Sequence, residues 1–284
     1  MSITRSSPVQ VAAYTTSYSQ NPKLVSTSWT RASVGPSHVL AIKSNNTLWA
    51  WGINTDGQLG DGTTVSRSSP VQLGNPSYTW NDISAGVNFS VGLRGDNLLF
   101  AWGINNSGQL GDLNAGTTSR SSPIQIGTSS WTQISAGGTH TVAIRSDKSL
   151  WGWGLNTSGQ LGTNDTVNRS SPTQVGALTS WINIGAASSG SYQTFGIQSN
   201  GTLWAWGYGA NNMGFNDLLS RSSPTQIGTS NWSKITHGDS NSATTMGIKT
   251  NGTLWGWGMN IANSGEIGVS DTVKRSSPTQ VGAL

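Results

Sequence analysis

Cysteine is absent from the 284 residues, which excludes disulfides, cysteine-based zinc sites and cysteine nucleophiles. Glutamate occurs once, as Glu266, so the chain has little material for the paired carboxylates of general acid–base catalysis. No run of 18 apolar residues exists, and we therefore expect no membrane span. The first residues lack the apolar segment of a signal peptide, so we expect no secretory signal.

Charged residues are also scarce, at 9% of the chain against roughly 25% in a typical soluble protein. The net charge is only +4, and six of the nine arginines belong to one repeated motif. Because the positive excess is small and mostly tied to that repeat, we expect no nucleic-acid binding. Ser, Thr, Asn and Gly fill the polar positions instead.

Tryptophan is abundant by contrast, with 14 residues that follow a fixed pattern. Runs of the type Leu-Trp-Ala-Trp-Gly occur five times, and Phe100 replaces one tryptophan in the second run. The second aromatic residue of the runs lies at Trp51, Trp102, Trp153, Trp206 and Trp257. This spacing of 51, 51, 53 and 51 residues indicates one supersecondary unit that is repeated along the chain.

Each repeat contains four candidate strands. The first follows a tryptophan, as in residues 131–137, and the second shows the alternation of residues 141–145. The third is the Leu-Trp-x-Trp-Gly run, whose two tryptophans point to the same side because they lie two residues apart. The fourth follows an Arg-Ser-Ser-Pro motif. Four short strands without helical periodicity predict a four-stranded antiparallel blade.

All 14 tryptophans fall in the first or third strand of a repeat. A ligand site uses one or two aromatic side chains, whereas packed sheets need large rings at every interface. We therefore interpret the tryptophans as structural, each burying roughly 150–250 Å².

The Arg-Ser-Ser-Pro motif occurs six times, once more than the tryptophan runs. Proline at the start of a strand favours an edge position, because it cannot donate to a central ladder. The additional copy, residues 5–8, lies in an N-terminal extension, residues 1–28, ahead of a single repeat domain, residues 29–284. We predict that its strand, with Arg5, Val9 and Val11, interacts with a neighbouring edge or subunit.

The sequence resembles a known repeat family in several features. These are the Trp-Gly-x-Asn-x-x-Gly-Gln-Leu-Gly signature of residues 51–60, the period of about 51 residues, and the His-x-x-Ala-Ile strands at His38 and His140. They resemble the RCC1 (regulator of chromosome condensation) repeat over residues 29–284. The resemblance implies an all-β, RCC1-like β-propeller of four-stranded antiparallel blades, most familiar with seven blades.

The number of blades departs from that family pattern, since only five complete motifs are present. Propellers close with about four to eight blades. We therefore expect about five blades in a compact ring, with the N-terminal strand as a surplus element that covers an edge or pairs with another subunit.

Polar residues of the repeats have structural interpretations. Each repeat arginine from Arg67 onward has an aspartate four to eight residues upstream, which predicts an ion pair inside each blade. His38, His140 and His237 suit packing or hydrogen bonding. The sequence shows neither a Ser-His-Asp arrangement nor a calcium or phosphate loop. We therefore expect no catalytic, cofactor-binding or metal site, and no cofactor.

Departures from the repeat are the places where function could reside, because the scaffold constrains the other positions. The fourth copy replaces the usual turn with residues 208–215, and Tyr208, Asn211 and Phe215 are candidate interaction residues there. The fifth copy lengthens the same turn. Decay of the repeat explains these changes equally well.

The leading functional prediction is a non-enzymatic interaction or structural propeller that binds a protein partner or a neighbouring subunit. The polar composition without an export signal suggests a virion surface or decoration protein, assembled on a larger particle; the cytoplasm is the other location considered. The resemblance implies two alternatives. One is a guanine-nucleotide exchange regulator of a small GTPase, and the other is an inhibitor that caps an enzyme.

Overall fold

The computed structural model describes residues 28–74, 77–112, 116–187, 192–209, 213–238, 244–260 and 265–282. These residues form an all-β structure, and none of them lies in an α-helix. Of the N-terminal extension, only Ser28 is described. The predicted strand with Arg5, Val9 and Val11 therefore lies outside the described residues, as does Asn211.

Nineteen strands follow one another among the described residues, in the repeated order that the sequence predicts. The first two blades comprise β1 (Trp29–Val34), β2 (His38–Lys43), β3 (Leu48–Gly52), β4 (Arg67–Gln72), β5 (Trp80–Ala85), β6 (Phe89–Arg94), β7 (Leu99–Gly103) and β8 (Arg120–Gln125). The others comprise β9 (Trp131–Ala136), β10 (His140–Arg145), β11 (Leu150–Gly154), β12 (Arg169–Gln174), β13 (Trp181–Ala186), β14 (Gln193–Gln198), β15 (Thr202–Gly207), β16 (Arg221–His237), β17 (Thr244–Lys249), β18 (Leu254–Gly258) and β19 (Arg275–Gln280).

Each blade is an antiparallel meander, as the third blade shows. Its strands pair in the order β9-β10-β11-β12, with Ala143 opposite Ile134 on one side and Trp151 on the other. The pairing of β11 with β12 shifts register between Gly152 and Gly154, where the Arg-Ser-Ser-Pro strand begins. This bulge bends the outer strand away from β11 at the point where the long loop ends and β12 begins.

The fourth and fifth blades share one long strand. β16 runs through 17 residues, so it is both the outer strand of the fourth blade and the inner strand of the fifth. The two blades therefore form a single seven-stranded sheet, β13 to β19. In the other blades a short link separates the outer strand of one blade from the inner strand of the next, as the sequence predicts.

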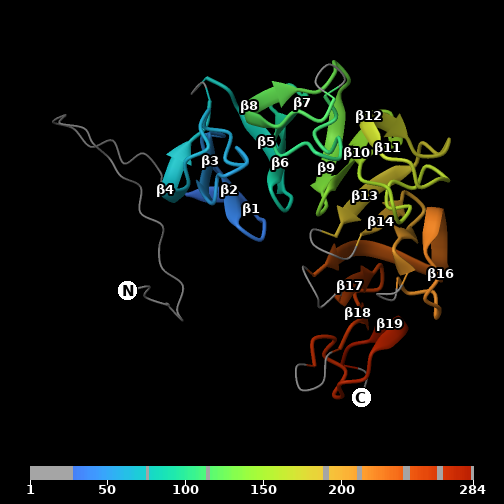
Figure 1. Cartoon of the computed structure of the whole chain (residues 1–284). Coiled ribbons are helices and arrows are strands. Elements are labelled where there is room, and N and C mark those ends of the chain that lie inside the picture. The colour runs from blue at the N-terminus through green and yellow to red at the C-terminus, as the bar shows by residue number, and fades with distance from the viewer. Residues whose placement is uncertain are drawn as a thin grey trace.

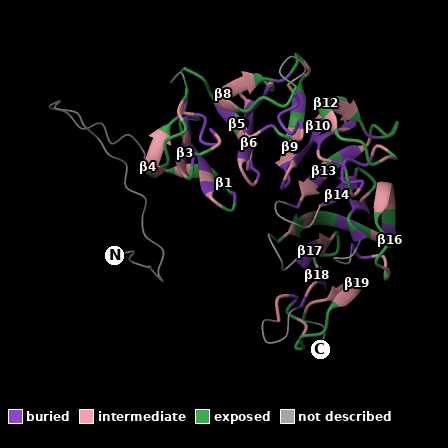
Figure 2. Cartoon of the chain, viewed as in Figure 1, coloured by how far each residue is buried: buried purple, intermediate pink, exposed green. Residues whose placement is uncertain are grey.

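The tryptophans form the core of every blade, which confirms their structural interpretation. In the third blade the ring of Trp131 meets Trp151 edge-on, with centroids 6.3 Å apart, and lies 5.9 Å from Trp153. The buried residues lie inside and between the blades, and the exposed ones lie mainly on loops (Figure 2). Only the first blade differs, since Trp29 and Trp51 are partly exposed where the equivalent residues of the other blades are buried.

The blades form an open arc with the first and fifth blades at its two ends (Figure 1). Among the described residues, close strand packing between blades links only neighbours along the chain, as between β1 and β5 or β9 and β13. The prediction of about five antiparallel blades is confirmed, whereas the expected compact ring is wrong, because the described blades form an open arc. In the part of the chain that the structure describes, no preceding blade covers the first blade, which explains the partial exposure of Trp29 and Trp51.

Candidate interaction surface

Topology places the long loops of all blades on one side of the arc. In an antiparallel meander, the loops after the first and third strands leave from the same end of the sheet. The loop between the third and fourth strands is the longest in each blade. We call the end that carries these loops, within residues 53–66, 104–119, 155–168, 208–220 and 259–274, the long-loop face.

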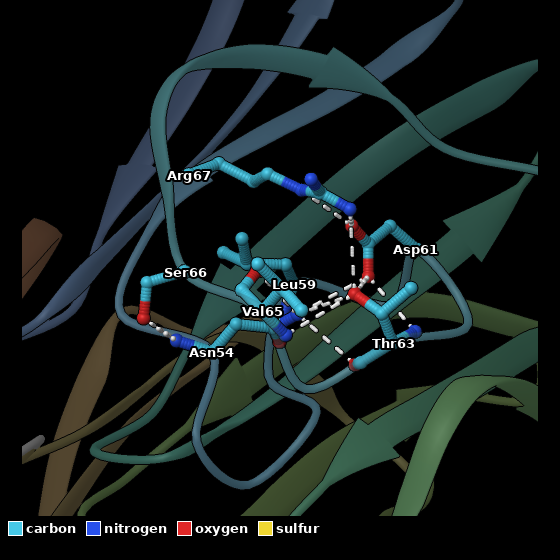
Figure 3. Close-up of polar contacts among 7 residues, drawn as sticks. All are labelled: Asn54, Leu59, Asp61, Thr63, Val65, Ser66 and Arg67. Carbon is cyan, nitrogen blue, oxygen red and sulfur yellow. Dashed lines mark hydrogen bonds and ion pairs between the residues drawn. The ribbon is translucent and has the colours of Figure 1, made fainter.

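A buried asparagine holds four of the five long loops in place, and the first blade shows how (Figure 3). The Asn54 side-chain amide donates to Asp61 Oδ1 at 3.1 Å and to the carbonyls of Thr63 and Val65 at 3.0 and 3.2 Å. Its Oδ1 accepts from the backbone amide of Leu59 at 2.9 Å. One side chain thereby supplies the hydrogen bonds that a neighbouring strand would otherwise give to the loop backbone. The loop is held in place without secondary structure of its own.

The same contact recurs where the sequence repeats asparagine. Asn105, Asn156 and Asn260 each accept from the amide five or seven residues later and donate to a loop carbonyl. The fourth blade has Gly209 at this position instead, and its amide donates to Ser220 Oγ at 3.1 Å. The loop that carries Tyr208 is therefore built without the asparagine.

Ion pairs between aspartate and the repeat arginines fix the far side of each loop, which confirms the sequence prediction. The pairs, with their N–O distances, are Arg67–Asp61 (2.7 Å), Arg120–Asp112 (2.8 Å), Arg169–Asp165 (2.5 Å), Arg221–Asp217 (2.8 Å) and Arg275–Asp271 (2.6 Å). Each arginine charge is thus balanced locally. The long-loop face therefore carries little net charge from this motif.

The candidate residues of the fourth loop have different surroundings. Tyr208 is exposed on the long-loop face, as expected of an interaction residue. Phe215 is partly buried against the core of the last two blades, and the guanidinium of Arg221 lies 3.7 Å from its ring centroid. Phe215 takes the sequence position of Asp61 in the first blade, so its ring stacks with the arginine while Asp217 supplies the carboxylate.

Exposed apolar side chains gather on the long-loop face, a feature that the sequence analysis missed. Seven large apolar side chains of the described loops are between 38% and 67% exposed there: Ile53, Val65, Val167, Tyr208, Leu218, Leu219 and Val273. Four of them, Val65, Val167, Leu219 and Val273, stand two residues before a repeat arginine. This periodicity was visible in the sequence, but only the structure shows that the positions are exposed.

All three histidines make hydrogen-bonding contacts, in agreement with the prediction; His38 and His140 are buried, and His237 is half-buried. His38 Nε2 lies 2.9 Å from Ser90 Oγ in the next blade, and His140 Nε2 lies 3.0 Å from Thr194 Oγ1. His237 Nδ1 lies 2.8 Å from Thr245 Oγ1. Burial lowers the pKa of each histidine to about 4, so all three are neutral near pH 7.

A second repeated feature, on the opposite end of the blades, also escaped the sequence analysis. The last residue of the second strand is basic in four blades, and its charge lies 3.4–4.8 Å from the centroid of the first ring of the Trp-x-Trp pair. These residues are Lys43, Arg94, Arg145 and Lys249. Their spacing of one repeat, and of two repeats across Gln198 in the fourth blade, was the available signal.

The described residues contain no group of three or more His, Cys, Asp or Glu side chains placed to hold a metal ion. They also contain no helix long and apolar enough to cross a membrane.

Comparison with known proteins agrees with the geometry. The sequence profile of the RCC1-like domain matches residues 4–284, nearly the whole chain. The chain belongs to the RCC1-like domain family. Among curated proteins it is similar to the ultraviolet-B receptor UVR8 of Arabidopsis thaliana, with 27% identity over 88% of this chain and 69% of that protein.

A second relative is the probable E3 ubiquitin-protein ligase HERC6 of Homo sapiens, with 33% identity over 62% of this chain but only 18% of that protein. Among solved structures, human WBSCR16 gives a TM-score of 0.75 at 21% identity, covering 89% of this chain and 67% of its own. Yeast RCC1 (Prp20) bound to Kap60 gives a TM-score of 0.73 at 18% identity, covering 90% of this chain and 64% of its own. Both structural likenesses support the propeller fold.

Proposed function

We propose that this RCC1-like propeller is a non-enzymatic protein-interaction module that binds its partner through the long-loop face. The observation that carries the proposal is the row of exposed aliphatic side chains on that face, one in each of four blades. Single exposed apolar residues are common, but a repeated set on one face is typical of a contact surface.

The structure of the loops supports this function. A surface that binds without reordering keeps its entropic cost low, and here buried asparagines and ion pairs hold the loops in place. Because the five described repeat arginines are already paired, the face favours a partner with an apolar contact area over a highly charged one. Tyr208 adds an amphipathic aromatic residue, a type that is enriched at the centres of interfaces.

The proposal is tested by placing a photo-crosslinking amino acid at Tyr208 and, in a second variant, at Leu178. Leu178 is similarly exposed but lies in the link between β12 and β13, at the opposite end of the blades. Irradiated in extract of the producing cells, the Tyr208 variant is expected to yield one defined adduct that the Leu178 variant lacks. Equal labelling from both positions, or none from Tyr208, would refute the choice of this face.

Regulation of a small GTPase by nucleotide exchange is the second candidate, and the family membership of the chain favours it. A GTPase in the Tyr208 adduct, with faster release of labelled GDP in the presence of the propeller, would establish it. An inhibitor that caps an enzyme would instead appear as an enzyme in the adduct. The comparisons offer no support for the virion surface role.

A further inference from the structure

A polar cavity lies on the outer edge of the arc between the second and third blades. Its volume is about 250 Å³, and its lining includes Asp112, Gln125, Trp131, Arg145 and Pro172. Asp112 belongs to a long loop, while Arg145 ends the second strand of the third blade. The cavity therefore extends from the long-loop side toward the cation–aromatic pairs at the other end.

Arg145 differs from the other arginines of the described chain because it has no carboxylate partner. Its guanidinium lies 3.4 Å from the Trp151 ring centroid and 5.0 Å from that of Trp131, and its Nε is buried without a hydrogen-bond partner. The other seven described arginines each pair with an aspartate: Arg31, Arg67, Arg94, Arg120, Arg169, Arg221 and Arg275. Trp131 Nε1 is also unpartnered, but Trp181 and Trp232 share that property, so Arg145 is the distinguishing group.

The second blade shows what a paired arginine looks like at this position. Arg94 Nε and Nη2 donate to the Asp96 carboxylate, at 3.0 and 2.5 Å to Oδ2. Asp147 is the equivalent of Asp96 in the third blade. Arg145 nevertheless makes no hydrogen bond or ion pair with it among the described contacts.

Three residues of this turn differ between the two blades, and one of them, Ser149, engages the Asp147 carboxylate. Asp147 Oδ1 accepts from the backbone amide of Ser149 at 2.9 Å and from its Oγ at 2.5 Å. Ser149 Oγ in turn accepts from Trp151 Nε1 at 2.8 Å. In the second blade Leu98 stands at the position of Ser149 and offers no hydroxyl. The hydroxyl of Ser149 thus holds the carboxylate of Asp147 and leaves the guanidinium of Arg145 without a partner.

We propose that this cavity binds the carboxylate of a glutamate or aspartate side chain presented by the protein partner, with Arg145 as its main ligand. The proposal rests on the interaction function above and adds the chemistry of the partner. The planar guanidinium fork matches a carboxylate in two parallel hydrogen bonds, as Arg94 shows with Nε donating to Asp96 Oδ1 and Nη2 to Oδ2. Trp131 and Pro172 provide an apolar wall for the methylene groups of the incoming side chain.

The local charge favours a carboxylate over a phosphate. Asp112 of the lining pairs with Arg120, and Asp147 acts on Arg145 only through its charge, without a hydrogen bond, so the surroundings are close to neutral before a ligand arrives. The Asp112 carboxylate of the lining would repel a dianion more strongly than a single negative charge. Burial lowers the pKa of Arg145, which reflects the cost of a desolvated cation that a carboxylate would relieve.

The test is an NMR titration that follows the Nε–H signal of Arg145. The probes are the capped peptides Gly-Glu-Gly and Gly-Gln-Gly, with sodium acetate in a third titration. We expect the glutamate peptide to shift the Arg145 signal saturably and the glutamine peptide to leave it unchanged. Acetate that binds as tightly as the glutamate peptide would overturn the assignment to a peptide side chain.

Three variants make the test specific. R145Q should abolish the binding, and the fold accommodates glutamine because Gln198 stands at this position in the fourth blade. S149L, which copies Leu98, should free Asp147 to pair with Arg145. The affinity for the glutamate peptide should then fall at least tenfold although the guanidinium is still present. R94Q should leave the peptide affinity unchanged. Binding retained in folded R145Q, or equal shifts from both peptides, would overturn the proposal.

The outcome is separable from that of the proposed function. A Tyr208 adduct that forms equally well with R145Q would remove the cavity from the interface and leave the long-loop face in place. Arg145-dependent peptide binding without any adduct from Tyr208 would support the cavity as a binding site and refute the choice of the long-loop face.

Discussion

At the scale of single residues, the buried asparagines are the side chains on which the long loops depend. Asn156 donates to Thr163 Oγ1 and to both the carbonyl and Oδ1 of Asp165, and it accepts from the Leu161 amide. The repeat made this asparagine visible in the sequence, but not its partners. They lie up to nine residues away in an irregular loop, whose path depends on the packing of Leu161 into the core.

N156A should therefore destabilise the protein by about 2–3 kcal/mol, since it leaves buried loop groups without partners. Chemical denaturation would measure the change. Exposed Thr157 supplies the control, and T157A should remain within about 0.5 kcal/mol of the wild type. Similar stability of N156A and T157A would contradict the role of the asparagine.

The buried histidines predict a dependence of stability on pH. The pKa of His140 is about 4 in the folded chain and near 6.5 when unfolded, so the unfolded state binds the proton first as the pH falls. The stabilisation is complete above pH 6.5 and is lost toward pH 4, by about 3 kcal/mol for this residue. H140F copies Phe89 of the second blade and should reduce that loss by the same amount in denaturation curves across this range. An unchanged pH profile in H140F would show that His140 is not buried and neutral.

At the scale of elements, the sequence predicted the strands and their order because the period-two and 51-residue patterns are local. It missed the fusion of two strands into β16, since a short link and an extended link look alike in composition. It also proposed Phe215 as an interaction residue. Its ring is covered because Arg221, six residues later, stacks on it, and that contact depends on how the loop folds back.

Contacts between blades depend on the glycine that ends each Gly-Gln-Leu-Gly turn. Gly111 has a φ of +78°, and an added Cβ would lie 2.8 Å from Trp153 Nε1 of the next blade. Gly127 has a similar φ of +62° but open space around it. Both substitutions to alanine incur the backbone strain, while only G111A adds a steric clash.

G111A should therefore cost about 1–3 kcal/mol more than G127A in denaturation experiments. The difference isolates the contact between the second and third blades from the backbone effect. Equal losses would mean that the neighbouring tryptophan moves freely and that the blades are only loosely coupled.

At the scale of the whole molecule, the sequence predicted blades but not their closure. Whether the last blade meets the first depends on the angle between successive blades, summed over four interfaces, and no local pattern specifies that angle. The candidate surface was likewise predictable only where it depends on local sequence. The sequence singled out Tyr208, but recognising the row from Val65 to Val273 required knowing that these positions share one face.

The most direct test of the account is the affinity of the crosslinked partner for a variant in which Val65, Val167, Leu219 and Val273 are all serine. The control variant is L178S combined with Y78S, on the opposite end of the blades. We predict binding at least tenfold weaker for the first variant, with the control unchanged and both variants folded, because the apolar contact area is lost only from the long-loop face. Wild-type affinity in the fourfold variant would contradict the account.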